Sequence, residues 1–103
     1  MKKEAPLTEA VYYILLALRK PNHGYGIIQE VQEMTDNRVN LGPGTLYGAI
    51  NSLLDKNWIE LHSEEKQSRK KKSYIITSMG KQVFDNEVAR LKELVKNSEK
   101  MGD

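Results

Sequence analysis

Residues 42–56 read GPGTLYGAINSLLDK, and the organisation of the chain can be worked out from this stretch in both directions. Proline is favoured at the first position of a helix, because its missing N–H would have no partner there. The stretch therefore predicts a helix that starts at Pro43, with Gly42 as its cap, and continues to about Lys56. Its apolar residues follow the spacing i, i+4, i+7, i+8, which is the clearest amphipathic stripe in the chain. These residues are Leu46, Ile50, Leu53 and Leu54.

The opposite face of this helix is small, polar and almost uncharged. Helical geometry places there Gly44, Gly48, Asn51, Ser52 and Asp55, with Thr45 and Tyr47 at the two edges. An ordinary solvent-exposed face is the alternative, but such faces usually collect Lys and Glu. In a major groove, Asn, Ser and Thr can hydrogen-bond base edges, and a Tyr hydroxyl can donate to a phosphate. We therefore favour DNA contact through Pro43, Gly44, Thr45, Tyr47, Asn51 and Ser52.

Two shorter helices are predicted before residue 42. Thr8 is a suitable N-cap for a helix that runs to about Arg19 and is apolar on nearly all sides. One small core cannot cover such a helix, so a second surface has to pack against it. The next helix is predicted over 24–35, and its inward residues are Ile27, Ile28, Val31 and Met34. Residues 36–41 predict one extended turn or a very short strand.

Two strands and a long helix follow. Residues 58–63 and 72–77 are rich in aromatic and β-branched residues and predict a β-hairpin. Thr77 or Ser78 caps a final helix over about 79–100, whose apolar residues have the 4-3-4 spacing of helix–helix packing. The segment order predicts a winged helix-turn-helix, mainly α with a small β-hairpin and therefore of the α+β class. Residues 1–77 would form the winged unit, and residues 78–103 the C-terminal helix.

The loop between the two strands holds a basic patch. Its members are Lys66, Arg69, Lys70, Lys71 and Lys72. Such side chains neutralise phosphates without reading sequence. A solvated loop is the alternative for a lysine-rich tip. Because the uncharged helix face precedes it, we interpret the patch as a contact with the DNA backbone.

The composition excludes several classes of protein. A chain of 103 residues with 39% hydrophobic content predicts one domain, and a net charge of +2 is too small for a basic nucleic-acid tail. The chain has no cysteine, which excludes disulfides, thiolate metal sites and a cysteine nucleophile. The longest apolar run, residues 10–18, falls short of the roughly 20 residues that span a bilayer. We expect a cytoplasmic protein without a membrane partner.

Catalysis and cofactor binding have no candidate residues. His23 and His62 have no second ligand at metal spacing, so we predict neither a metal nor a cofactor. Gly42 and Gly44 could form a phosphate cradle, but no Walker lysine accompanies them. No Ser or Thr is paired with a histidine and a carboxylate in a recognisable pattern. We therefore predict that the protein is not an enzyme.

Together these segments resemble the PadR-type transcriptional regulators, in particular the compact members that lack an extra C-terminal domain. The resemblance covers most of the chain and rests on five pieces in order. They are LLAL at 15–18, HGYGI at 23–27, GTLY at 44–47, LLDKNWI at 53–59 and KSYIITSMG at 72–80. Gly48, where the family often has proline, and the tip Gln67-Ser68-Arg69, where it often has glycines, depart from the pattern. Gly48 costs helix stability of about 1 kcal/mol.

The resemblance implies a homodimer on a pseudo-palindromic operator, with residues 78–103 as the dimerisation helix. That helix would pack across the two-fold axis on the first helix of the partner, which explains the two uncovered apolar surfaces. The expected interface residues are Tyr12, Leu16, Phe84, Val88, Leu91 and Val95. The resemblance also implies repression that a small molecule relieves, and the candidate effector residues are Tyr12, Tyr13, Val88 and Leu91.

Two alternatives remain open at this point. The effector residues can be plain dimer core, because an apolar stripe at helical spacing is usually packing. Trp58, the single tryptophan, is predicted at the start of the wing and away from that interface. The whole chain can also be a winged-helix module that binds another protein without contacting DNA. An acidic helix face would favour that function, whereas the face here is neutral.

Overall fold

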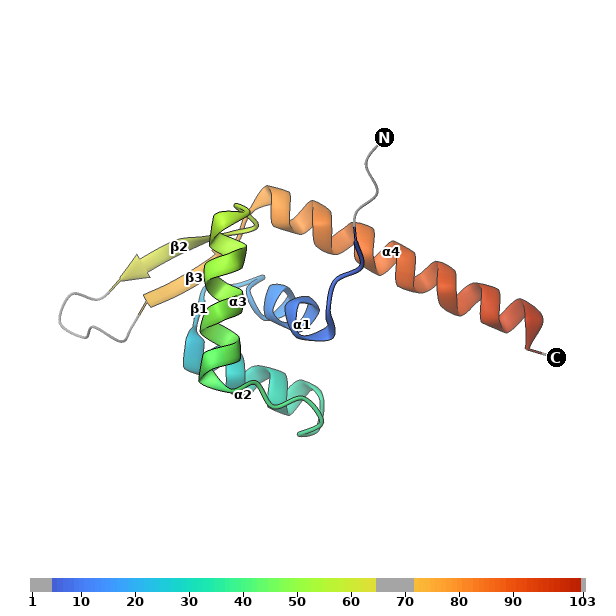
Figure 1. The fold of residues 1–103 in the computed structure, drawn as a ribbon, viewed down its shortest axis with the longest axis horizontal. Coiled ribbons are helices and arrows are strands. Elements are labelled where there is room, and N and C mark those ends of the chain that lie inside the picture. Colours follow the sequence, from blue (N-terminus) through green and yellow to red (C-terminus); the bar gives the residue numbers. More distant parts are fainter. Residues whose placement is uncertain (1–4, 65–71, 103) are drawn as a thin grey trace.

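The computed structural model describes residues 5–64 and 72–102, which form four helices and a three-stranded antiparallel sheet. The helices are α1 (Glu9–Ala17), α2 (Gly24–Met34), α3 (Pro43–Asp55) and α4 (Ser78–Met101). The strands are β1 (Asn22–His23), β2 (Ile59–Glu64) and β3 (Lys72–Ile76), in the order β1-β3-β2. Helices α1 to α3 cluster together, β2 and β3 extend to one side, and α4 extends to the other (Figure 1). This architecture confirms the predicted α+β winged helix-turn-helix.

The helix starts follow the capping residues in the sequence. The Thr8 side chain accepts a hydrogen bond from the Val11 amide at 3.1 Å, and Thr77 accepts one from Gly80 at 3.0 Å. Pro43 stands at the start of α3 behind Gly42, as predicted. For α2 the cap is His23, whose Nδ1 accepts from the Gly26 amide at 3.1 Å. A histidine cap is uncommon, and the sequence analysis did not identify it.

The core lies where α1, α2 and α3 meet the sheet. The largest side chains with almost no exposed surface come from all three helices and from β2, and they are Ile14, Leu15, Leu18, Ile27, Val31, Leu46, Ile50, Leu53 and Ile59. The predicted stripe of α3 is therefore the central part of the core. The Ile76 amide of β3 donates to the Leu18 carbonyl at 2.9 Å, which joins the sheet to the end of α1. Each buried aliphatic side chain contributes roughly 1.5–3 kcal/mol to stability.

The sheet has one strand more than the predicted hairpin. In β1, Asn22 pairs with Tyr74 and His23 with Ser73, so two residues form a third strand along β3. A strand of this length has no alternating pattern that a sequence could show. The very short strand considered for residues 36–41 is absent. Asp36 and Asn37 have left-handed backbones with φ of 53° and 66° there, and they form a turn that ends α2.

Other expectations need smaller corrections. Helix α1 ends at Ala17 rather than Arg19, β2 starts at Ile59, and β3 ends at Ile76. Met34, predicted on the inner stripe of α2, has 42% of its surface exposed, because it lies in the last turn beyond the packed part of the helix. These differences shift the ends of elements and leave their order unchanged.

Helix α4 is packed against the rest of the chain only at its beginning. Gly80, Val83 and Glu87 are buried, and every residue from Lys92 to Gly102 is exposed. Gly80 is required for this packing, because a Cβ at that position would lie 2.1 Å from the Trp58 carbonyl oxygen. The second half of α4 projects from the molecule, which measures 58 × 35 × 21 Å (Figure 1).

Candidate nucleic-acid interface

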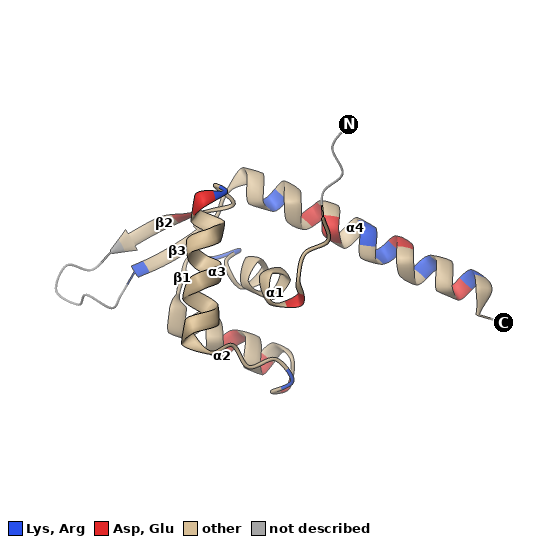
Figure 2. Cartoon of the chain, viewed as in Figure 1, with Lys and Arg blue, Asp and Glu red and all other residues tan. Residues whose placement is uncertain are grey.

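Helix α3 presents the predicted polar face to solvent. Gly44, Thr45, Gly48, Asn51 and Ser52 are all exposed. On the other side Leu46, Ile50 and Leu53 are buried, and Leu54 is half-buried. Nothing lies within 4 Å of the space that a side chain on Gly44 or Gly48 would occupy. No charged residue occurs from Pro43 to Leu54, so the helix is free of charge until its last turn (Figure 2). The face therefore carries only short side chains, is open to solvent and has no charge.

Tyr47 fixes the position of α3 relative to α2. A Cβ on Gly24 would lie 2.3 Å from the Tyr47 hydroxyl oxygen, so the ring end rests directly on the first residue of α2. The ring is nevertheless 45% exposed and borders the open face. The predicted hydroxyl–phosphate contact remains compatible with this position, because the hydroxyl lies at the junction of the two helices.

Tyr25 is a surface residue that the sequence analysis did not assign to the interface. It occupies the first turn of α2, directly after the Gly24 that Tyr47 contacts, and is 68% exposed. An aromatic residue between two glycines was the available signal in the sequence. Tyr25 is a second exposed tyrosine, and it directly follows the residue at which α2 contacts Tyr47 of α3.

Ser52 lies at the edge of the open face rather than at its centre. It borders a cavity together with Leu53, Lys56 and Trp58, on the side of α3 that faces α1. The structure thus separates two of the predicted base-reading residues. Asn51 lies on the open face, and Ser52 borders the cavity.

The wing is the β2–β3 hairpin, which stands beside α3 (Figure 1). Its register pairs Ile59 with Ile76 and Glu64 with Lys72, with an irregularity between Leu61 and Ser63. Lys72 is exposed at the outer end of β3. Lys66, Arg69, Lys70 and Lys71 lie outside the described residues, so their predicted backbone contacts stay predictions.

The residues predicted for a dimer interface gather on α1 and α4. Tyr12 stacks on Phe84 with ring centroids 4.9 Å apart, and Tyr13 meets Tyr12 edge to face at 5.3 Å. Leu16, Val88 and Leu91 are half-buried, whereas Val95 is 56% exposed. Tyr12, Val88, Leu91 and Val95 border one groove with Lys92, Lys96 and Glu99. Tyr13 borders an adjoining hollow beside Glu87 and Arg90, and Tyr12 and Leu91 line that hollow as well, so these two residues border both spaces.

Two ion pairs among the described residues involve α1 and α4. Arg38, in the α2–α3 connection, hydrogen-bonds the Glu9 carboxylate at the start of α1, which lowers the pKa of Glu9 and raises that of Arg38. On α4, Arg90 donates two hydrogen bonds to Glu87 at 2.9 and 2.7 Å. These bonds hold the pKa of the Glu87 carboxyl below its ordinary value, and the Leu7 backbone contributes in the same direction.

Comparison with known proteins decides the family. Residues 14–86 match the model of the transcriptional regulator PadR-like family, which is most of the chain. The chain belongs to the PadR-like transcriptional regulators. A protein of Lysinibacillus sphaericus, described as uncharacterized, is 38% identical over 82 residues, which cover 79% of this chain and 69% of that protein. Proteins of this family are generally not enzymes.

Solved structures agree with the fold of this PadR-like chain. A PadR family regulator from Clostridium difficile R20291 is 23% identical and superposes with a TM-score of 0.75, covering 93% of this chain and 100% of that one. PadR of Bacillus subtilis, solved in complex with operator DNA, is 26% identical with a TM-score of 0.69. The match covers 81% of this chain and 48% of the B. subtilis chain.

Within 5–64 and 72–102, no three His, Cys, Asp or Glu side chains come together as metal ligands. None of the helices in that part of the chain combines the length and the apolar character needed to cross a membrane. Helix α3 runs unbroken through Gly48, the residue that departs from the family pattern.

Proposed function

We propose that this PadR-like chain is a dimeric, sequence-specific DNA-binding regulator that reads base edges with α3. The observation that carries the proposal is the open face of α3, which is exposed and uncharged and has only short side chains, with the Tyr47 ring at its edge. A helix with such a face can approach base edges closely in a major groove. The likeness to B. subtilis PadR, a protein solved with operator DNA, supports the same function.

The contact residues fall into two groups by chemistry. Thr45 and Asn51 offer hydrogen bonds to base edges, and the Asn side chain matches adenine in a bidentate fashion. For the phosphates we propose Tyr25, Tyr47 and the start of α3 at Pro43 and Gly44, because hydroxyls and helix N-termini can bind the DNA backbone. Lys72, with the other basic residues of the predicted patch, adds sequence-independent attraction along the wing.

Dimerisation is proposed through α4 and α1. The exposed second half of α4 carries Leu94 and Val95, which are 51% and 56% exposed, and continues the stripe of Val88 and Leu91. This stripe lies next to Tyr12 of α1, so one continuous apolar surface is left uncovered in a single chain. A two-fold axis through it would cover both helices in one interface.

We infer that the dimer represses transcription and that a small molecule relieves repression. The inference rests on the resemblance to PadR-type regulators. Repression would require that the operator of this chain lies in or next to a promoter. A ligand can release DNA only if it binds the DNA-free form more tightly than the DNA-bound form.

The test of the proposed function is selection of bound duplexes from a random pool by the purified chain. The expected product is a pseudo-palindrome whose half-sites lie about one helical turn, or roughly 34 Å, apart, because a two-fold dimer presents two copies of α3. Enrichment of a single half-site would contradict the proposed binding as a two-fold dimer. No enriched sequence would contradict base reading and favour a protein-interaction module.

A further inference from the structure

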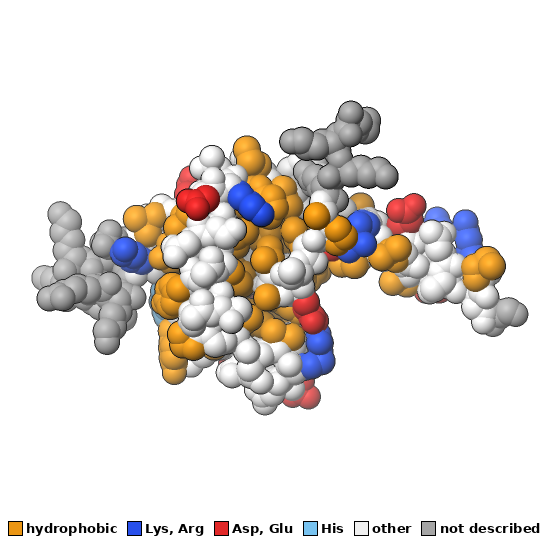
Figure 3. Space-filling model, in the orientation of Figure 1, with side chains coloured by type: hydrophobic (Ala, Val, Ile, Leu, Met, Phe, Trp, Pro, Cys, Tyr) orange, Lys and Arg blue, Asp and Glu red, His pale blue; other side chains and the backbone are white. Residues whose placement is uncertain are grey.

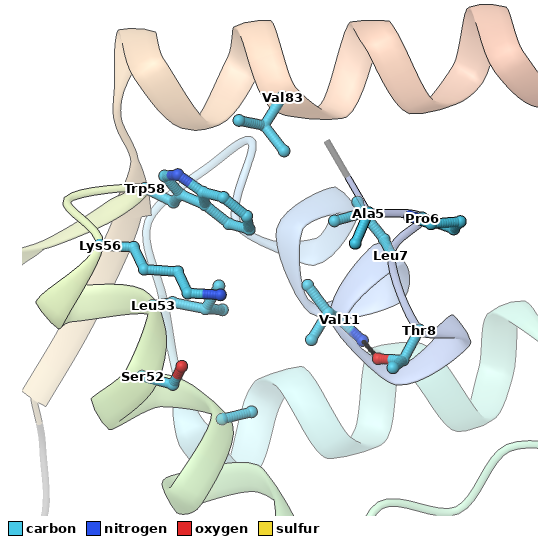
Figure 4. A pocket seen from close by; sticks show the side chains of 11 residues that line it. Ala5, Pro6, Leu7, Thr8, Val11, Ser52, Leu53, Lys56, Trp58 and Val83 are labelled. Atoms are coloured by element: carbon cyan, nitrogen blue, oxygen red, sulfur yellow. Dashed lines mark hydrogen bonds between the residues drawn. The ribbon is translucent and has the colours of Figure 1, made fainter. Parts of the chain in front are cut away.

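A cavity of about 380 Å³ lies between α3, the start of α1 and the first turns of α4. Its walls come from the chain around Leu7, from Val11 of α1, from Ala49 and Leu53 of α3, and from Val83 of α4. Figure 4 shows these side chains pointing toward one space, with the Trp58 ring along one side. In Figure 3, hydrophobic side chains gather beside α3 in the same region. The volume falls in the range of small-molecule sites, roughly 300–1,000 Å³.

The polar groups of the cavity are few and of one sign. The lining includes no Asp or Glu, and its only charged side chain is Lys56. The Lys56 ammonium lies 4.7 Å from the centre of the Trp58 ring and forms no ion pair with any described residue. The Ser52 hydroxyl borders the same space, and it too has no hydrogen-bond partner within the described ranges. Thr8 is different, because its hydroxyl accepts from Val11.

We propose that this cavity binds a small apolar molecule with one anionic group. The apolar part would lie among Leu7, Val11, Leu53 and Val83, against the face of Trp58. The anionic group would pair with Lys56 and accept a hydrogen bond from Ser52 at the rim. A single unpaired cation beside an apolar cavity selects for this combination, because a charge-assisted hydrogen bond is about twice as strong as a neutral one.

The groove along α4 is a weaker place for such a ligand. It is bordered by Lys92, Lys96 and Glu99, which present both signs of charge, and by residues of the proposed dimer interface. The cavity beside α3 belongs to one chain and uses none of the predicted interface residues. Ala49 and Ser52 connect it to α3, so an occupied cavity would touch the helix that we propose to read DNA. Ligand binding itself does not depend on that function.

Trp58 allows a direct test, because it is the single tryptophan of the chain. The full chain is titrated with octanoate, below the concentration at which octanoate forms micelles, while tryptophan fluorescence is excited selectively. Octanol serves as the uncharged probe of the same length. The expected result is a saturable change of Trp58 emission with both probes, measured without DNA.

Variants separate the contribution of the charge from that of the apolar wall. Lys56→Met keeps a long unbranched side chain. It should lower the affinity for octanoate about tenfold and leave the midpoint of the octanol titration unchanged. Lys92→Met, which alters the α4 groove instead, should change neither midpoint. Ala49→Leu fills the cavity and should weaken the binding of both probes. Circular dichroism confirms that this variant folds.

Three results would overturn the proposal. No saturable change of Trp58 emission would remove the site. Equal weakening of both probes by Lys56→Met would show that Lys56 does not recognise the anion. A loss of octanoate binding in Lys92→Met, with Lys56→Met unaffected, would place the ligand in the α4 groove. Because no arm contains DNA, each result is independent of the proposed DNA binding.

Discussion

Single residues determine how closely the helices of this chain approach one another. Gly24 is buried beneath the Tyr47 hydroxyl, and this contact leaves no room for a side chain on α2. Gly48, on the same helix as Tyr47, faces open space. The two glycines therefore have different roles. Gly24 permits close packing of α2 against α3, and Gly48 leaves the exposed face of α3 without a side chain at that position.

Gly24→Ala should destabilise the fold. The new methyl would lie 2.3 Å from the Tyr47 hydroxyl oxygen, and such overpacking costs typically 1–3 kcal/mol. Urea unfolding measures the loss. Gly48→Ala is the matched control, because it adds the same methyl in open space and should stabilise α3 by up to about 1 kcal/mol.

A double-mutant cycle identifies the cause of that loss. If Tyr47 is the obstacle, Gly24→Ala in a Tyr47→Leu background should cost clearly less than in the wild type, because the hydroxyl and outer ring are gone. Strict additivity of the two substitutions would show that the contact does not position α3.

Asn51→Ala should weaken binding to the operator by about 1–3 kcal/mol and leave binding to unrelated duplexes unchanged. The reason is that Asn51 lies on the exposed face of α3 and carries no charge, so its contribution depends on base identity. Titrations of the selected duplex and of a scrambled one measure both quantities. Equal losses on the two duplexes would contradict base reading by this residue.

At the scale of elements, one described ion pair connects two segments of the chain, and the other lies within α4. Arg38 joins the α2–α3 connection to the start of α1 through Glu9. The Glu87–Arg90 pair lies on α4 near Leu7, and Glu87 is buried whereas Arg90 is about one-third exposed. Both carboxylates have a pKa below the ordinary value of 4.5.

The Glu87 pair predicts a specific dependence of stability on pH. A carboxyl whose folded-state pKa is lowered stabilises the fold above its unfolded pKa, and this contribution disappears as pH falls through the folded pKa. Glu87→Gln should therefore reduce the free energy of unfolding by about 1 kcal/mol at neutral pH. The difference from the wild type should shrink at acidic pH, as pH falls through the lowered pKa of Glu87.

Urea unfolding at both pH values measures that difference. Glu9→Gln is the comparison variant, since the Glu9–Arg38 pair is exposed on both sides and more sensitive to salt. A difference between Glu87→Gln and the wild type that stays constant with pH would show that ionisation of Glu87 does not stabilise the fold.

The elements that could be predicted are those with a repeated pattern. The stripe of α3 and the 4-3-4 spacing of α4 are apolar positions that repeat along the sequence. The caps Thr8 and Thr77 are single residues, but each stands directly before the start of its helix. Strand β1 has only two residues and forms because the backbone of β3 offers partners. Its position depends on tertiary contact, which local sequence does not show.

At the scale of the whole molecule, a single chain leaves an apolar surface uncovered on α1 and α4. The Tyr12–Phe84 stack anchors the beginning of α4 on α1, and the exposed half of α4 continues beyond it (Figure 1). An uncovered apolar surface on a small chain supports the proposed dimerisation.

Leu91→Glu should convert the proposed dimer into a monomer and abolish operator binding at the same time. The substitution places a charge in the middle of the apolar groove that Tyr12 and Val95 border. Ala89→Glu is the matched control, because it adds the same charge at an exposed position of α4 outside that groove. Sedimentation measures the mass, and a Leu91→Glu variant that stays dimeric would remove α4 from the interface.

The candidate sites differ in how far the sequence predicted them. The open face of α3 follows from helical periodicity alone, so its residues were placed correctly at the surface. The cavity beside Trp58 is formed by α1, α3, α4 and the residues before α1, and no local spacing brings these together. Tyr25 follows Gly24, on which Tyr47 of α3 packs, and this tertiary contact has no signal in local spacing.

The most direct test of the proposed function is fluorescence anisotropy of a labelled duplex from the DNA upstream of this chain's own gene. A scrambled duplex and a salt series complete the measurement. We predict tight binding that weakens with salt and prefers the upstream duplex by at least roughly a thousandfold. Equal, weak binding to both duplexes at moderate salt, repeated with the duplexes enriched by selection, would contradict sequence-specific recognition by α3.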